Sequence, residues 1–196
     1  MARHFGFAYL DTGLLYRAIG QKLLQQGVDL ADSTAAVEIA CNLGFDDLRS
    51  AILRDDDIAH AAGVGAAHPD VRKALYGLQQ RFAAQPPGGA PGTVLDGRDI
   101  GTVICPDAQI KLFIEASIEV RARRRHKELQ ARGLNSIYSR VLRDMRERDA
   151  RDRSRAIAPL VPADDAYVLD TTECDEDSVF RSALAFISSR TPLNSE

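Results

Sequence analysis

The sequence predicts an α/β fold in which helices flank a parallel sheet, because short apolar runs are followed directly by a polar turn and an amphipathic helix. Phe7–Leu10 has the composition of a buried strand, ends at Asp11-Thr12-Gly13, and precedes a helical pattern that runs from Leu14 to about Gln26. Ile110–Ile114 is a second such strand, followed by a helix. In folds of this kind ligands bind at the carboxyl ends of the strands.

The remaining elements are placed by helix-capping residues and by breaks in the apolar pattern. Further predicted elements are a helix capped by Asp32 or Ser33 and ending near Asn42, a helix from Pro69 to Ala84, a strand at Thr93–Leu95, a strand at Tyr167–Asp170, and a helix from Asp175 or Ser178 to Ser189. Residues 43–57 have too weak a pattern to assign, and we expect the tail after Arg190 to be disordered.

Two more helices are predicted in the basic part of the chain. Ser117 caps the first, which ends near Gly133, and the second extends from Ser136 to about Arg155. The apolar side of the second helix, predicted to face inward, consists of Ile137, Val141, Leu142 and Met145.

Length and composition indicate a single cytoplasmic domain. The 196 residues are 45% hydrophobic, and no apolar run approaches the roughly 20 residues that a membrane span requires. Cys41, Cys105 and Cys174 are scattered and form no CxxC pair, so they indicate neither a disulfide framework nor a zinc site. We expect them to act as small hydrophobic residues.

Charge is distributed unevenly along the chain. Residues 121–155 contain 13 Lys and Arg against 5 Asp and Glu, a balance of +8 that leaves −11 for the remainder of a chain whose net charge is −3. A focused positive zone on an acidic body favours a small polyanionic ligand over a long nucleic acid.

Within this basic zone, Glu147–Arg155 has a spacing that suits phosphate recognition. A continuing helix would place Arg148, Asp152 and Arg155 on one face. A carboxylate between two guanidinium groups fixes their directions, and Arg forks suit phosphate oxygens, while the Asp can also accept from a sugar hydroxyl. The alternative is a solvated helix face with internal ion pairs.

The turns after two predicted strands are further candidates for a binding site. Asp96-Gly97-Arg98-Asp99 brings two carboxylates and a guanidinium to the carboxyl end of a strand, although an internally paired polar turn is the alternative. Thr12 occupies the N-cap position of its helix, and the same turn offers backbone N–H groups to an anion.

Four motifs in this order make the chain resemble the bacterial cytidylate kinases over nearly its whole length. They are Asp11-Thr12-Gly13-x-x-Tyr16-Arg17, Pro69-x-Val71-Arg72, Asp96-Gly97-Arg98-Asp99-Ile100-Gly101-Thr102, and Glu147-Arg148-Asp149-x-Arg151-Asp152-Arg153-x-Arg155-x-x-x-Pro159-Leu160. The resemblance implies a P-loop nucleoside monophosphate kinase fold with a parallel sheet flanked by helices. It also implies one domain over 1–196: a core (1–26, 93–125 and 150–196), a monophosphate-binding insert (27–92) and a lid (126–149).

The resemblance also implies an activity and a set of site residues. The activity is transfer of the ATP γ-phosphoryl group to CMP or dCMP, with ATP as co-substrate and Mg as the metal. The implied CMP-binding residues are Thr12, Arg17, Arg72, Arg98, Asp99, Arg148, Asp152 and Arg155, among which Arg98, Arg148 and Arg155 would be catalytic. Arg124 and Arg125 match lid-base arginines that lie over ATP, and Asp96 matches a carboxylate that orients Mg through water.

Two departures from the family pattern stand out. Gly63 stands where the family usually has a Ser beside the cytosine. The family also opens with a central strand, a GxxxxGK(S/T) loop and a helix, and this loop motif occurs nowhere in the 196 residues. We therefore expect the first strand, the loop and part of the first helix to be missing, Met1–His4 to form the last turn of that helix, and the strands at 93–95 and 110–114 to remain unpaired with each other.

Three functions remain open at this point. The chain is an active cytidylate kinase, a truncated and inactive CMP-binding relative, or a nucleic-acid-binding module that uses residues 121–155. The third is disfavoured because the basic zone has a single aromatic residue, Tyr138, and the whole chain is acidic. We expect CMP, dCMP and ATP as partners of a monomer that binds neither nucleic acid nor membrane.

Overall fold

The computed structural model describes residues 1–50, 53 and 56–190. The chain forms two compact units, Met1–Ile100 and Gly101–Glu196. None of the helices in the described ranges combines the length and apolar character needed to cross a membrane.

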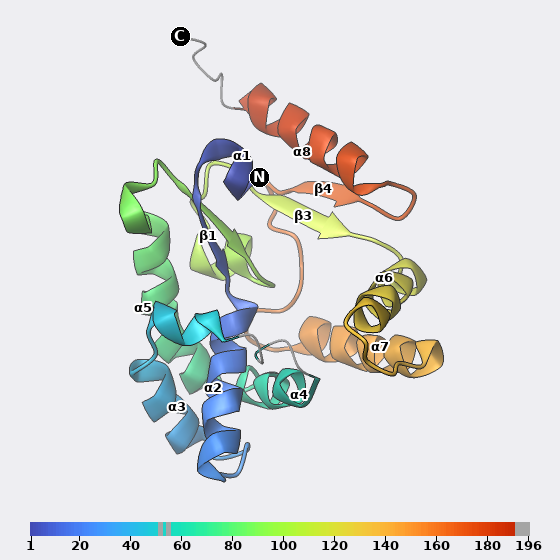
Figure 1. Cartoon of the computed structure of the whole chain (residues 1–196). Coiled ribbons are helices and arrows are strands. Elements are labelled where there is room, and N and C mark those ends of the chain that lie inside the picture. The colour runs from blue at the N-terminus through green and yellow to red at the C-terminus, as the bar shows by residue number, and fades with distance from the viewer. Residues whose placement is uncertain (51–52, 54–55, 191–196) are drawn as a thin grey trace. The chain divides into compact units, whose positions relative to one another are not determined.

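The first unit surrounds a short parallel sheet with helices (Figure 1). Its elements in chain order are α1 (Ala2–Phe5), β1 (Ala8–Asp11), α2 (Gly13–Gln26), α3 (Ser33–Cys41), the 3-10 turn η1 (Phe45–Arg49), α4 (Asp56–Gly65), α5 (Pro69–Ala84), the 3-10 turn η3 (Pro87–Gly89) and β2 (Thr93–Asp96). β1 and β2 are parallel and in register, from Ala8 opposite Thr93 to Asp11 opposite Asp96. This register brings both strand-terminal carboxylates to the same edge.

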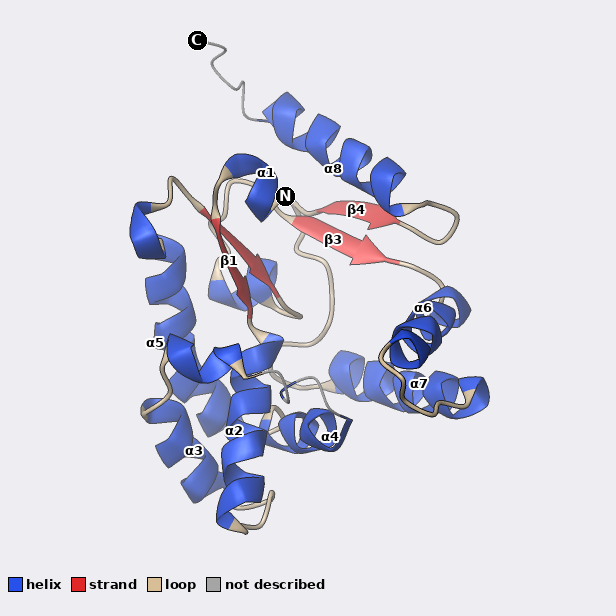
Figure 2. Cartoon of the chain, in the orientation of Figure 1, coloured by secondary structure: helices blue, strands red, loops and turns tan. Residues whose placement is uncertain are grey.

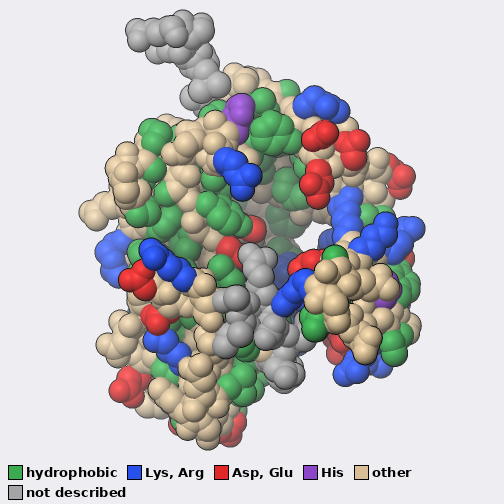
Figure 3. Space-filling view, viewed as in Figure 1, with side chains coloured by type: hydrophobic (Ala, Val, Ile, Leu, Met, Phe, Trp, Pro, Cys, Tyr) green, Lys and Arg blue, Asp and Glu red, His purple; other side chains and the backbone are tan. Residues whose placement is uncertain are grey.

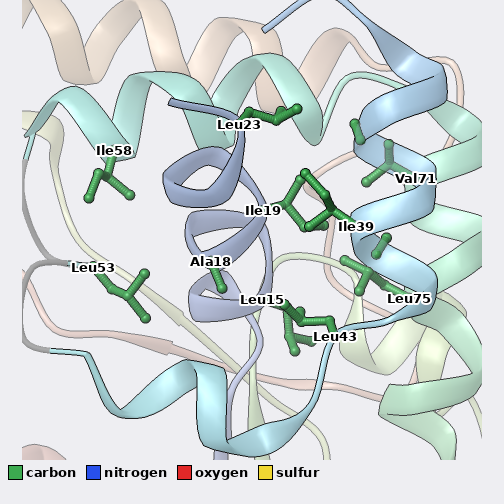
Figure 4. Packing of buried hydrophobic residues seen from close by; sticks show 12 residues of the cluster. Leu15, Ala18, Ile19, Leu23, Ile39, Leu43, Leu53, Ile58, Val71 and Leu75 are labelled. Atoms are coloured by element: carbon green, nitrogen blue, oxygen red, sulfur yellow. The ribbon is translucent and has the colours of Figure 1, made fainter. Parts of the chain in front are cut away.

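The hydrophobic core of the first unit is built around α2. Leu15, Ile19 and Leu23 on this helix are fully or almost fully buried, and they pack with residues of α3 and α5. Figure 4 shows Leu53 and Ile58 on the other side of α2, so the helix contributes apolar contacts in more than one direction.

Gly20 allows α2 and α4 to approach closely. A Cβ atom at this position would lie 2.8 Å from the Cβ of Ala61 and 2.9 Å from the backbone nitrogen of Ala62. These distances are shorter than any ordinary van der Waals contact, so a residue with a side chain would push the two helices apart.

The second unit contains a parallel strand pair and two long basic helices (Figure 2). After the π-helical turn η4 (Ile100–Ile104), its elements are β3 (Leu112–Glu115), α6 (Ile118–Ala131), α7 (Tyr138–Ser154), β4 (Tyr167–Asp170) and α8 (Glu176–Arg190). β3 pairs with β4 from Leu112 opposite Tyr167 to Glu115 opposite Asp170, and α6 packs against α7. Among the described strands, β2 pairs with β1 and β3 with β4, so no ladder joins β2 to β3.

Most of the predicted elements are confirmed, including the β4 limits and two helix caps. Asp32 accepts hydrogen bonds from the backbone N–H groups of Thr34 and Ala35, and Ser117 accepts one from Val120. Met1–His4 was expected to be helical, and α1 indeed begins at Ala2. The unassigned stretch holds η1 and the start of α4, and the tail after Arg190 lies outside the described residues.

Four expectations need correction. Ile137 is 67% exposed because α7 begins only at Tyr138 and leaves Ile137 in the preceding extended segment. Arg155 follows the end of α7 with extended backbone angles, so it does not belong to the helix. Cys41 is exposed at the end of α3 and is not a core residue. The third predicted strand begins at Leu112, two residues later than expected.

Candidate functional site

Thr12 links the carboxyl ends of β1 and β2. Its backbone N–H and its hydroxyl both donate to the carbonyl oxygen of Asp96, at 2.9 and 2.8 Å. Thr12 is the N-cap residue of α2, as predicted, but its side chain makes no hydrogen bond to the backbone N–H groups of the helix. The side chain of Asp11 instead accepts from the N–H of Gly13, the first residue of α2.

Gly97 is required by the close approach of this turn to Thr12. A Cβ atom at Gly97 would lie 2.4 Å from Oγ1 of Thr12 and 2.8 Å from Cδ1 of Ile100. Both atoms would have to move, and the Thr12 hydroxyl would leave its hydrogen bond with Asp96. The glycine therefore keeps the turn after β2 tight against the start of α2.

Asp96 stands in an unusual electrostatic environment. Loss of surrounding water raises the pKa of its carboxyl group, and the nearby carboxylate of Asp11 raises it further. The hydroxyl of Tyr9, which donates to Asp96 Oδ2 at 3.4 Å, acts in the opposite direction. The adjacent carboxylates of Asp11 and Asp96 suit a small divalent cation that keeps most of its own water ligands, as Mg does. No group of three such ligands occurs in the described part of the chain.

Arg72 and Asp99 form a buried ion pair, with Nη2 of the arginine 2.5 Å from Oδ2 of the aspartate. Arg72 comes from α5 and Asp99 from the turn after β2, so the pair joins residues 27 positions apart. Nη1 of Arg72 also donates to the carbonyl of Ala66 at 3.4 Å, and its guanidinium carbon lies 5.8 Å from the ring centre of Tyr16. Contacts from three other segments thus fix this guanidinium in one orientation.

The other two predicted arginines of the first unit are also placed by local contacts. Arg17, on the first turns of α2, donates from Nη1 to the carbonyl of Leu53 at 2.8 Å. Arg98 lies close enough to Asp96 for its charge to favour the ionised carboxylate. Thr12, Arg17, Arg72, Arg98 and Asp99 therefore all lie in the first unit, around the carboxyl ends of its strands and the adjoining helices.

In the second unit, Asp152 holds the predicted arginines at the end of α7. Its side chain is 4% exposed and lies 2.5 Å from Nη2 of Arg155 and 3.8 Å from Nε of Arg148. The chain after the helix turns back, because the N–H of Leu160 donates to the backbone carbonyl of Asp152 at 2.9 Å. The structure therefore brings these three residues together as predicted, although Arg155 has already left the helix.

Arg124 and Arg125 differ in their surroundings. The guanidinium of Arg124 donates to the hydroxyl and carbonyl of Thr171, at 3.0 and 2.6 Å, and to the carbonyl of Cys174 at 3.2 Å. Arg125 pairs with Glu128 on the same helix at 2.8 Å. Arg124 thus ties α6 to the turn that follows β4, a contact that sequence spacing did not indicate.

Three further residues near these groups were missed by the sequence reasoning. Tyr16 supports Arg72, and Arg121 forms a two-pronged ion pair with Asp149. Both Tyr16 and Asp149 belong to the motifs quoted above, which is the one signal that could have indicated them. Figure 3 shows Lys and Arg side chains gathered around the α6–α7 hairpin, as the charge distribution of the sequence predicted.

Comparison with known proteins agrees with this arrangement. The family model described as cytidylate kinase matches residues 1–189. A cytidylate kinase of Paramagnetospirillum magneticum is 58% identical over 190 residues, which are 97% of this chain and 90% of that protein. Cytidylate kinases of Methylocella silvestris and Xanthobacter autotrophicus are each 55% identical, over 96% and 97% of this chain and 86% and 89% of their own lengths.

Because the matches cover nearly the whole of these relatives, they do not support the expected loss of a first strand and its phosphate-binding loop. The chain belongs to the cytidylate kinase family, and its fold and activity class are those of the nucleoside monophosphate kinases, which are phosphotransferases.

Proposed function

We propose that this chain transfers the γ-phosphoryl group of ATP to CMP or dCMP, giving CDP or dCDP. The observation that carries this proposal is the fixed Arg72–Asp99 pair, which is buried and held by contacts from several segments. We propose further that the chain acts as a cytoplasmic monomer, with CMP, dCMP and ATP as its partners and without nucleic acid or membrane.

The Arg72–Asp99 pair matches the hydrogen-bonding pattern of cytosine. Cytosine offers an amino donor at N4, which a carboxylate accepts, whereas uracil has a carbonyl acceptor at the same position. The guanidinium of Arg72 carries the donors that the ring N3 and O2 acceptors of cytosine need. A carboxylate facing the uracil carbonyl would be repelled, so this pair favours CMP over UMP.

The remaining arginines suit the phosphate and the sugar. We assign contacts with the CMP phosphate to Arg17, Arg98 and Arg155, contacts with the sugar to Arg148 and Asp152, and a further CMP contact to Thr12. Transfer of a phosphoryl group depends on positioning and on stabilisation of charge on the equatorial oxygens. Arg98, Arg148 and Arg155 would supply that positive charge, which makes them the catalytic residues of the proposal.

The ATP side of the proposal involves Arg124, Arg125 and Asp96. The lid-base arginines would lie over ATP, with Arg124 held in place by Thr171 and Cys174. Asp96, with Asp11 beside it, would orient a Mg ion through its water ligands. When bound, this ion would neutralise charge on the phosphates.

We also propose a division of labour along the chain. Residues 27–92 form a monophosphate-binding insert, residues 126–149 form a lid, and the remaining segments form the core. The insert contains α3, α4 and α5, including Arg72, and the lid contains the turn between α6 and α7.

Calorimetric titration with CMP and UMP tests the proposal. We expect the chain to bind CMP more tightly than UMP, and Arg72→Met to weaken CMP binding by about tenfold, since each charge-assisted contact contributes about 1.5 to 3 kcal/mol. Arg81→Met, which removes an exposed arginine from the same helix, is the matched control and should bind CMP like the unmodified chain. A folded chain that gives no heat with CMP would refute the proposal.

A further inference from the structure

Arg121 and Asp149 form the most completely satisfied ion pair between the two basic helices. Nη1 and Nη2 of Arg121, in the first turn of α6, lie 3.2 and 2.6 Å from the two carboxylate oxygens of Asp149 on α7. Nε of the same guanidinium donates to the carbonyl of Ala116 at 3.0 Å. The side chains are 28% and 13% exposed, so this fork-to-fork contact is largely shielded from water.

A second ion pair joins the same two helices, but it has fewer contacts and is more exposed to water. Nη2 of Arg146 lies 3.0 Å from Oε1 of Glu119 through a single contact, and the side chains are 58% and 48% exposed. Exposed single contacts of this kind contribute little to a fixed geometry because water screens them and both side chains remain mobile. Of these two ion pairs, the Arg121–Asp149 pair is therefore the one that can fix the position of α7 relative to α6.

The Arg121–Asp149 contact lies next to the Arg148–Asp152–Arg155 cluster in the sequence. Asp149 directly follows Arg148 and precedes Asp152 by three residues, so it lies on the helical turn that carries these two members of the Arg148–Asp152–Arg155 cluster. At its other end the contact reaches Ala116, which directly follows the last residue of β3. Through one guanidinium, the cluster is connected to the end of a sheet strand.

We propose that Arg121, acting through Asp149, is a positioning residue for the Arg148–Asp152–Arg155 cluster, which it holds in register with the end of β3. This inference rests on the proposed function, in which that cluster binds the sugar and phosphate of CMP. Three of the five N–H groups of the Arg121 guanidinium donate to Ala116 and Asp149, so these contacts fix its orientation.

The test compares CMP affinity across variants that disturb one ion pair at a time. Arg121→Met and Asp149→Asn should each raise the Kd for CMP by about tenfold, a typical effect of losing a residue that positions a binding group. Asp149→Asn is nearly isosteric, so it provides a second route if Arg121→Met does not fold, and circular dichroism at the titration temperature verifies folding. Arg121→Lys keeps the charge without the fork and should give an intermediate Kd.

Arg146→Met is the matched control, because it removes one positive charge from the same helix pair without touching the fork. It should leave the Kd within about twofold of the unmodified chain, since an exposed pair of this kind contributes little. If Arg121→Met and Arg146→Met weaken CMP equally, the effect is one of net charge and the positioning role is refuted. A folded Arg121→Met chain with unchanged affinity refutes it as well.

A double-variant measurement separates positioning from general stability. In an Arg155→Ala background one of the three groups that Asp149 positions is gone, so Asp149→Asn should raise the Kd by clearly less than its full tenfold effect, whereas independent effects would multiply. Full multiplication would overturn the inference. Failure of the unmodified chain to bind CMP would overturn the proposed function instead, so the two failures are distinguishable.

Discussion

The carboxylate of Asp152 lies 2.5 Å from the guanidinium of Arg155 and is almost fully removed from water. Asp152→Ala would leave Arg155, whose side chain is only 17% exposed, without this counter-charge. We expect the free energy of unfolding to fall by about 3 kcal/mol, as for other shielded ion pairs that lose one partner. Urea denaturation measures this, with Asp144→Ala, at an exposed pair of the same helix, as the control that should change little.

Gly97→Ala should destabilise the chain by about 1 to 3 kcal/mol, the usual cost of overpacking a tight site. The new Cβ would lie 2.4 Å from the Thr12 hydroxyl, which must then give up its bond to Asp96. Gly65→Ala is the control, since nothing lies within 4 Å of a Cβ there. Equal melting temperatures for the two variants would show that the turn can relax without cost.

Asp96→Asn should raise the melting temperature at pH 7. Because the fold raises the pKa of Asp96, its ionised form is less favourable in the folded state than in the unfolded state. This penalty exists above the folded-state pKa and disappears below the unfolded value of about 4, so the advantage of the variant should shrink as the pH falls toward 4.

Asp165→Asn should have the opposite effect on stability at pH 7, because the fold lowers the pKa of Asp165. A hydrogen bond from the Lys111 ammonium group lowers the pKa of Asp165, so ionised Asp165 favours the folded state at neutral pH. This variant should lose stability at pH 7 and approach the unmodified chain as the pH falls through the carboxylate range. Differential scanning fluorimetry from pH 4 to 7 covers both variants, and two shifts of the same sign would contradict the assignment.

Local patterns predicted the elements whose signals are local. Tyr167–Asp170 is an apolar run with clear limits, and Asp32 caps α3 through its own neighbours along the chain, so both were predicted correctly. The hydrogen bond of the Thr12 hydroxyl was not predicted, because its acceptor, the Asp96 carbonyl, lies 84 residues away and becomes available only when β1 and β2 pair.

In the candidate site, too, contacts between residues close in sequence were predictable and contacts between distant residues were not. Arg148 and Asp152 are four residues apart on one helix, so their proximity follows from helical geometry alone. The partners of Arg72, Arg121 and Arg124 lie 27, 28 and 47 residues away. No periodicity in the sequence specifies such pairs, and the resemblance named only some of their members. Ile137 shows the converse, since an apolar residue just outside a helix start needs no buried partner.

The absence of a side chain at Gly20 also affects residues that do not touch it. It sets the distance between α2 and α4, and Gly63 lies on α4 two residues beyond Ala61. A side chain introduced at residue 63 would therefore have its position determined partly by the opposite helix. Any bulk at position 20 would move α4 away from α2, and every group carried on α4 would move with it.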